Sequence, residues 1–120
     1  MSRRRTWMLS PHEGGSRIPP SLREVIRHRI LAHAEAHYGG RYHRIDVRFR
    51  GALCYIDAYC EPEREVPIHL CRIRYFAGRG QWSLAFYTYS HERYEPAMFP
   101  TGDMFGTPEE AFDVGAVYLQ

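Results

Sequence analysis

The sequence contains no lysine and no asparagine, so all 16 of its Lys or Arg side chains are arginines. Both missing amino acids have AT-rich codons, and a GC-rich bacterial genome explains their absence better than selection for arginine chemistry does. The 14 acidic side chains leave a formal net charge of only +2. This balance argues against a protein held to nucleic acid mainly by counterion release, which needs a large basic excess.

Long apolar runs are also missing. No stretch approaches the ~20 apolar residues that cross a bilayer, and residues 1–10 hold no apolar segment long enough for a signal peptide. We therefore expect a cytoplasmic protein without membrane contact. Cys54, Cys60 and Cys71 are odd in number and lack C-x-x-C spacing, which excludes a closed disulfide framework. We expect three buried structural thiols.

What the chain does contain is enough for one core. It has 120 residues, of which 44% are apolar and 14% aromatic, a composition typical of a globular domain. Residues 1–19 carry Arg3, Arg4 and Arg5 but no apolar periodicity. They predict a flexible basic arm before a single α+β domain over residues 20–120.

Helix signals stand near both ends of this domain. Residues 21–24 have the pattern of a capping box and precede a periodic apolar set that ends at two glycines, which predicts a helix over residues 21–38. Thr107, Pro108, Glu109 and Glu110 combine a cap hydroxyl, a proline at the first helical position and two acids in the first turn. They predict a second helix from about 108 to 118.

Alternating apolar and polar residues fill the space between the helices. They predict strands over 44–50, 52–60, 67–76 and 81–90, or three strands if Gly51 is a bulge inside one bent strand. The expected fold class is therefore α+β, with an N-terminal helix, an antiparallel meander of 3-4 strands and a C-terminal helix in a two-layer single domain.

The register follows from requiring one apolar face. Pairing Tyr75 with Trp82 sets Ile73 opposite Leu84, and it puts His69 on the inner side. Further expected pairs and buried positions include Cys71 opposite Phe86, and Ile45, Val47, Phe49, Cys54, Ile56 and Ala58 on the inner face. The opposite, outer face then carries Arg48, Arg50, Tyr55, Asp57, Tyr59, Arg72, Arg74, Ser83, Tyr87 and Tyr89.

Most of these outer residues are candidate binding residues, because Tyr and Arg are enriched at interface hot spots. We expect Asp57 to pair with Arg72 or Arg74. The first hypothesis is a non-enzymatic module that binds a protein partner or itself, with a homodimer as the expected assembly. The alternative is an ordinary solvent face, or one covered by the last helix. The candidate binding residues are Arg72, Arg74, Tyr55, Asp57, Tyr59, Tyr87 and Tyr89.

Two other functions use the same part of the chain. In a single-stranded nucleic-acid-binding protein, the tyrosines would stack on bases and the arginines would neutralise phosphates. In a small hydrolase-like enzyme, Asp57 and His91 would act as acid and base. Ser90 is adjacent to His91 and would point to the other face, so His91 would not activate it.

His33 and His37 have the i, i+4 spacing that puts two imidazoles on one helical face, as a zinc site requires. The sequence signals no third ligand nearby. We therefore assign no metal and no other cofactor.

Four segments carry a resemblance to known sequences. They are Ile56-Asp-Ala-Tyr59, Leu70-Cys-Arg-Ile-Arg-Tyr75, the run from Trp82 to Pro96, and Gly106-Thr-Pro-Glu-Glu-Ala-Phe112. Together they make the chain similar to a family of short uncharacterised bacterial proteins over most of residues 20–119. The resemblance implies no activity, cofactor or catalytic residue.

Overall fold

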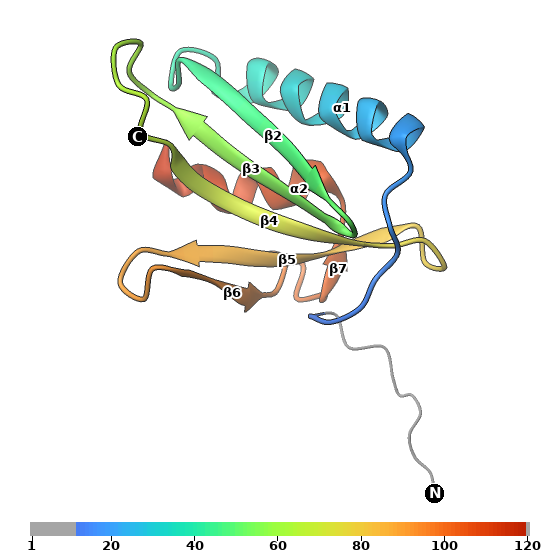
Figure 1. Cartoon of the computed structure of the whole chain (residues 1–120). Coiled ribbons are helices and arrows are strands. Elements are labelled where there is room, and N and C mark those ends of the chain that lie inside the picture. Colours follow the sequence, from blue (N-terminus) through green and yellow to red (C-terminus); the bar gives the residue numbers. More distant parts are fainter. Residues whose placement is uncertain (1–11, 120) are drawn as a thin grey trace, which may run out of the picture.

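The structure is a computed structural model that describes residues 12–119 (Figure 1). A helix at each end of the domain flanks a run of antiparallel strands, so the α+β class is confirmed. In chain order the elements are α1 (Pro20–Tyr38), β2 (Arg44–Arg50), β3 (Leu53–Tyr59), β4 (Ile68–Phe76), β5 (Gln81–Thr88), β6 (Arg93–Ala97), β7 (Phe105–Gly106), α2 (Pro108–Gly115) and a 3-10 turn η1 (Ala116–Tyr118).

The two helices begin in different ways. Thr107 forms the predicted capping box at α2, because its side chain accepts from the Glu110 N–H while the Glu110 carboxylate accepts from the Thr107 N–H. The capping box expected at Ser21 is not formed. Helix α1 starts one residue earlier, with Pro19 as its N-cap and Pro20 at the first helical position, where the fixed φ of proline suits a helix.

The sheet has more strands than the 3-4 expected. Its order is β2-β3-β4-β5-β6, and every pair is antiparallel. The short strand β7 pairs with the first part of β5, and β6 pairs with the rest of β5. Gly51 separates β2 from β3 in a tight hairpin turn with φ of 60°, so these are two strands. The sequence predicts no strand over residues 93–97, where Pro96 and charged residues interrupt the alternation. At a sheet edge a proline costs no ladder hydrogen bond.

The predicted register is confirmed where it was most specific. Tyr75 pairs with Trp82, and Ile73 with Leu84, and the apolar face packs against the helices. Ile45, Phe49 and Phe86, which were expected on this buried face, are only half-buried. The core contains Ile18, Ile26, Ile30, Ala34, Val47, Cys54, Ile56, Ala58, Leu70, Cys71, Ile73, Trp82, Leu84, Phe99, Ala111, Phe112, Ala116 and Leu119.

A β-bulge changes the register near the start of β4. Ile56 pairs with Cys71, but the next residue of β3, Asp57, pairs with His69, so Leu70 is an extra residue without a partner on β3. Leu70 and Cys71 are both fully buried. His69, expected on the inner face, therefore lies on the outer face beside Asp57, and that prediction was wrong.

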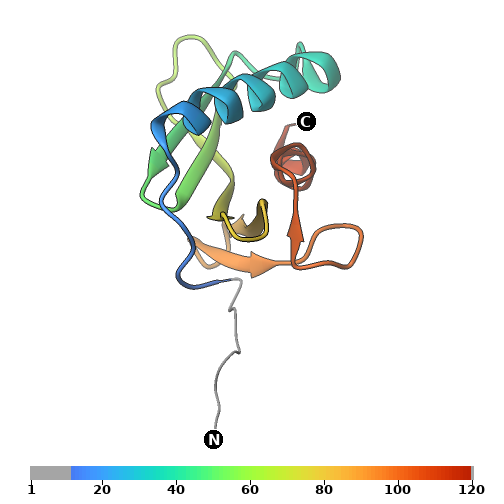
Figure 2. The same ribbon diagram turned by 90° about the vertical axis from the view of Figure 1, so that its right-hand side faces the viewer.

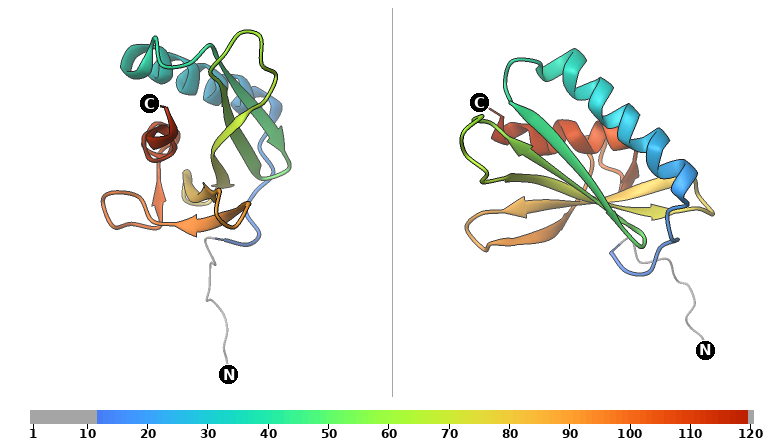
Figure 3. Two further views of the ribbon diagram at one scale, coloured as in Figure 1. Left: turned by 90° about the vertical axis from the view of Figure 1, so that its left-hand side faces the viewer. Right: turned by 45° about the horizontal axis from the view of Figure 1, so that its top comes forward.

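Both helices pack against the same side of the sheet (Figures 1 and 2). They are joined by Arg29 of α1, whose guanidinium makes two hydrogen bonds of 2.7 and 2.8 Å to the Glu109 carboxylate of α2. The last helix therefore does not cover the outer face, which was one of the expected alternatives. Figure 3 shows the same arrangement from two further directions. No helix within residues 12–119 has the length and apolar character needed to cross a membrane.

The part of the predicted arm that the structure describes follows the sheet. Ser16 donates its N–H to the carbonyl of Tyr75, Ile18 donates to Gly51, and the Ile18 side chain is fully buried. Arg3, Arg4 and Arg5 lie outside the described residues.

Candidate functional site

Asp57 is the centre of polar contacts on the outer face. Its side chain is only 3% exposed, although it carries a carboxylate. Arg48 Nη2 donates to Asp57 Oδ2 over 2.8 Å, and His69 Nδ1 lies 3.0 Å from Asp57 Oδ1. Neither Arg72 nor Arg74 is the partner, so the expected pairing of Asp57 with those arginines was wrong. The register explains this, because β3 lies between β2 and β4 and Asp57 meets Arg48 from one side and His69 from the other.

Aromatic rings surround this polar centre. The Tyr94 ring of β6 makes edge contacts with Tyr87 at 5.0 Å and with Tyr55 at 5.6 Å between centroids. The His69 ring lies 4.7 Å from Tyr87. Such edge-to-face pairs add to the energy of burial. We call Tyr55, His69, Tyr87, Tyr89 and Tyr94 the tyrosine cluster.

Tyr89 joins the cluster at the end of β5. Its ring meets Tyr87 edge-on at 4.7 Å, and its hydroxyl accepts the backbone N–H of His69 over 2.7 Å. Tyr118, which follows α2, donates its hydroxyl to the Tyr87 carbonyl over 2.6 Å. Strand β5 is thus held from both faces of the sheet.

Arginines stack on several tyrosine rings. The Arg48 guanidinium lies 5.2 Å from the centre of the Tyr55 ring, and Arg72 lies 5.2 Å from the Tyr94 ring. At the other end of β3, Arg44 lies 3.7 Å from the Tyr59 ring. These contacts occupy ring faces that a ligand would otherwise use.

The surroundings of Asp57 shift the pKa values of Tyr94 and Arg48 upward. Burial, followed by the negative charge of Asp57, raises the pKa of the Tyr94 hydroxyl far above its ordinary value. Burial alone would lower the pKa of Arg48, but its hydrogen bond to Asp57 and the charges of Asp57 and Asp46 outweigh that effect and raise it. Arg48 therefore stays charged and Tyr94 stays protonated over the physiological range.

The Asp57 and His69 pair has the geometry that orients an imidazole. A carboxylate bound to Nδ1 favours the tautomer whose other nitrogen, Nε2, accepts protons. Within residues 12–119 the hydrogen bonds of His69 go to Asp57 and Tyr89, and none goes to a serine or cysteine. The pair can orient the ring, but its described contacts supply no nucleophile.

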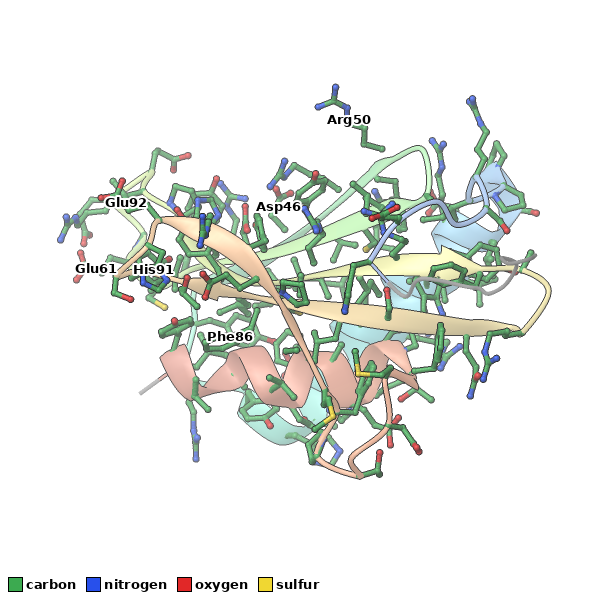
Figure 4. The ribbon with its side chains drawn as sticks, turned by 90° about the horizontal axis from the view of Figure 1, so that it is seen from below. Asp46, Arg50, Glu61, Phe86, His91 and Glu92 are labelled. Carbon is green, nitrogen blue, oxygen red and sulfur yellow. The ribbon has the colours of Figure 1, made fainter. Side chains whose placement is uncertain are left out.

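His91, the other residue of the hydrolase hypothesis, has a different partner. His91 lies in the turn between β5 and β6, and its Nδ1 lies 2.9 Å from Oε2 of Glu95 in β6. Figure 4 shows His91 next to Glu92 at one end of the sheet, and Phe86 directed toward α2. The structure thus pairs Asp57 with His69 and His91 with Glu95.

The histidines of α1 face the second helix. The rings of His33 and His37 are 4.5 Å apart, and His33 Nε2 lies 2.7 Å from an Asp113 oxygen that also accepts from the Tyr38 hydroxyl. Among the described residues no three His, Cys, Asp or Glu side chains are placed to hold a metal ion. These contacts link α1 to α2.

Two members of the site could not be read from alternation. His69 reaches the outer face only because of the bulge at Leu70, and Tyr94 belongs to a strand that contains Pro96. An excess of tyrosine after residue 86 was the one available signal for Tyr94.

Comparisons of the chain with protein families, with curated proteins and with solved structures found no match. The arguments for function therefore come from the geometry of the outer face.

Proposed function

We propose that the protein is a small cytoplasmic, non-enzymatic binding module that recognises a protein partner, or a second copy of itself, through the outer face of its sheet. The observation that carries this proposal is the tyrosine cluster. Its rings are half-exposed, they are fixed by mutual edge contacts and by arginines, and both helices lie on the other side of the sheet. Rigid aromatic anchors of this kind lose little entropy when they bind.

The same geometry favours a protein partner over single-stranded nucleic acid. A base stacks on the flat face of an aromatic ring. The faces of Tyr55 and Tyr94 are already in contact with Arg48 and Arg72. Hydroxyl groups and ring edges remain, and protein interfaces use these.

Sedimentation velocity tests the self-binding form of the proposal. Tyr87→Glu puts a charge into the tyrosine cluster, whereas Val25→Glu makes the same change at an exposed position of α1 in the other layer. If the protein binds itself, the wild type and Val25→Glu sediment as dimers and Tyr87→Glu as a folded monomer. Circular dichroism checks that each variant is folded.

Photo-crosslinking tests the form with a different partner. A benzoyl-phenylalanine at position 87 is expected to give a discrete protein adduct in cells that make the protein, and the same residue at position 25 is expected to give none. A wild type that stays monomeric at all concentrations, together with no adduct from position 87, would contradict the proposal.

A further inference from the structure

We propose that the partner of the outer face is a protein that presents an acidic segment, whose carboxylates bind Arg50, Arg72 and Arg74. The inference rests on the proposed function and names the chemistry of the partner. We call these three arginines the basic end of the face.

Strand pairing brings the three arginines together. Arg50 of β2 and Arg74 of β4 are both paired with Leu53 of β3, so they flank the same residue from opposite sides. Arg72 is paired with Tyr55, two positions along on the same face. Because neighbouring strands lie about 4.8 Å apart, the three arginine side chains start from one region of the outer face.

The basic end has an unbalanced charge. Arg48, which lies across Tyr55 from Arg72, is neutralised by Asp46 and Asp57, at 3.2 and 2.8 Å. Within residues 12–119 no ion pair neutralises the arginines of the basic end, and residues 1–11 contain no aspartate or glutamate. Figure 4 shows Arg50 pointing away from the body of the protein. Glu13 acts on Arg74 at longer range and offsets only part of this charge.

Two of these guanidinium groups are held in place without an acid. Arg72 lies over the Tyr94 ring, and Arg74 Nη1 donates to the Gly14 carbonyl over 2.9 Å. Burial, and then the charge of Arg72, lower the pKa of Arg74. An incoming carboxylate would relieve this repulsion, and the remaining N–H groups match its two oxygens.

The charge pattern favours carboxylates on a protein over a phosphate chain. Arg48 with its two aspartates lies across Tyr55 from Arg72, and Asp46 remains partly exposed. A continuous polyanion that crosses the face would meet this acid, while a short acidic segment would not. The neighbouring tyrosine cluster then contacts the uncharged part of the same partner.

Fluorescence anisotropy with a labelled oligoglutamate peptide tests the inference. We expect the wild type to bind the peptide at physiological ionic strength, and the double variant Arg72→Ala with Arg74→Ala to bind it roughly tenfold more weakly or worse, as the loss of charge-assisted hydrogen bonds requires. The matched control is Arg41→Ala with Arg64→Ala. It removes the same charge from loops outside the face and should leave binding unchanged.

Three results would overturn the inference: no binding by the wild type, equal loss in the control variant, or tighter binding of a labelled oligothymidylate that the same double variant abolishes. The last result would point to nucleic acid. If the position-87 adduct or the dimer persists while the peptide fails to bind, only the acidic chemistry is wrong. If those signals are also absent, the proposed function fails as well.

Discussion

A carboxylate that is removed from water is stable only when its charge is matched by donors and counterions. Asp57 meets this condition through Arg48 and His69, which come from different strands. The residue therefore ties β2, β3 and β4 together on the outer face, much as apolar contacts tie them on the inner face. Asp46, which also pairs with Arg48, is 35% exposed and offers a comparison.

Asp57→Ala should lower the free energy of unfolding by about 1–3 kcal/mol, because it leaves His69 and Arg48 without their shared partner. The cost stays below that of breaking a fully buried pair, since Arg48 is 51% exposed and can be hydrated. Asp46→Ala should cost about 1 kcal/mol or less. Urea denaturation of both variants measures the difference, and equal costs would contradict the role assigned to Asp57.

The three thiols should differ in reactivity. Burial raises the pKa of Cys54 to about 12 and that of Cys71 still further, and both side chains are fully buried. Cys60 is only half-buried, so the expectation of three buried thiols was too general. An aromatic disulfide reagent should titrate one thiol per native chain and three after unfolding. Loss of the native signal in Cys60→Ser would identify the residue. Rapid labelling of all three in the native protein would contradict this burial.

At the scale of elements, sequence reasoning worked where alternation is regular. The pairing of Tyr75 with Trp82 followed from the demand for one apolar face, and the cap at Thr107 followed from its hydroxyl, proline and acids. It failed where one residue breaks the period. The extra residue Leu70 moves the His69 side chain from the inner to the outer face of the sheet. No local feature of the sequence predicts a bulge at that position.

Gly115 of α2 packs directly against the bulge at Leu70. A Cβ added to Gly115 would lie 2.7 Å from the Leu70 carbonyl oxygen, so the helix approaches the bulge more closely than any other residue allows. This contact also explains why a glycine, a poor helix former, stands in a helix of eight residues. Gly115 is therefore what lets the helix reach the sheet.

Gly115→Ala should destabilise the protein by about 1–3 kcal/mol, although alanine is the better helix former by about 1 kcal/mol. The added methyl must push α2 away from Leu70 or shift the bulge. Thermal unfolding should therefore show a lower midpoint, and the NMR signals of His69 should move. Gly78→Ala is the control, because a Cβ there meets nothing within 4 Å. A higher unfolding midpoint for Gly115→Ala would show that the space between α2 and Leu70 can accept a methyl group.

At the scale of the whole molecule, an ion pair between Arg29 and Glu109 links the two helices, and its strength depends on pH. The hydrogen bonds of Arg29 lower the pKa of Glu109 below its ordinary value, against the opposite effect of burial. In the unfolded chain the carboxyl returns to about 4.3. The unfolded state then binds the proton more readily, so this contribution is complete above that value and is lost as the pH falls through the lower folded value.

The wild type should therefore lose stability below about pH 5 more steeply than Glu109→Gln does. The difference should be about 1 kcal/mol or less, because both partners remain partly exposed to solvent. Urea denaturation at a series of pH values measures it. The pKa of Glu95 is also lowered, mainly by its hydrogen bond to Arg93, and this group contributes the same change of stability with pH in both proteins. Identical slopes would mean that the ion pair contributes nothing.

The order of the elements along the chain has a consequence for synthesis. The strands β2 to β6 pair with their neighbours in sequence, so the sheet can form while the chain is still emerging from the ribosome. Phe112 and Leu119, which are almost fully buried against that sheet, are made after these strands. Helix α1 can already pack against β2, but the apolar face of β4 and β5 stays uncovered until residues 108–119 fold. In that interval the nascent protein is most exposed to aggregation and most dependent on chaperones.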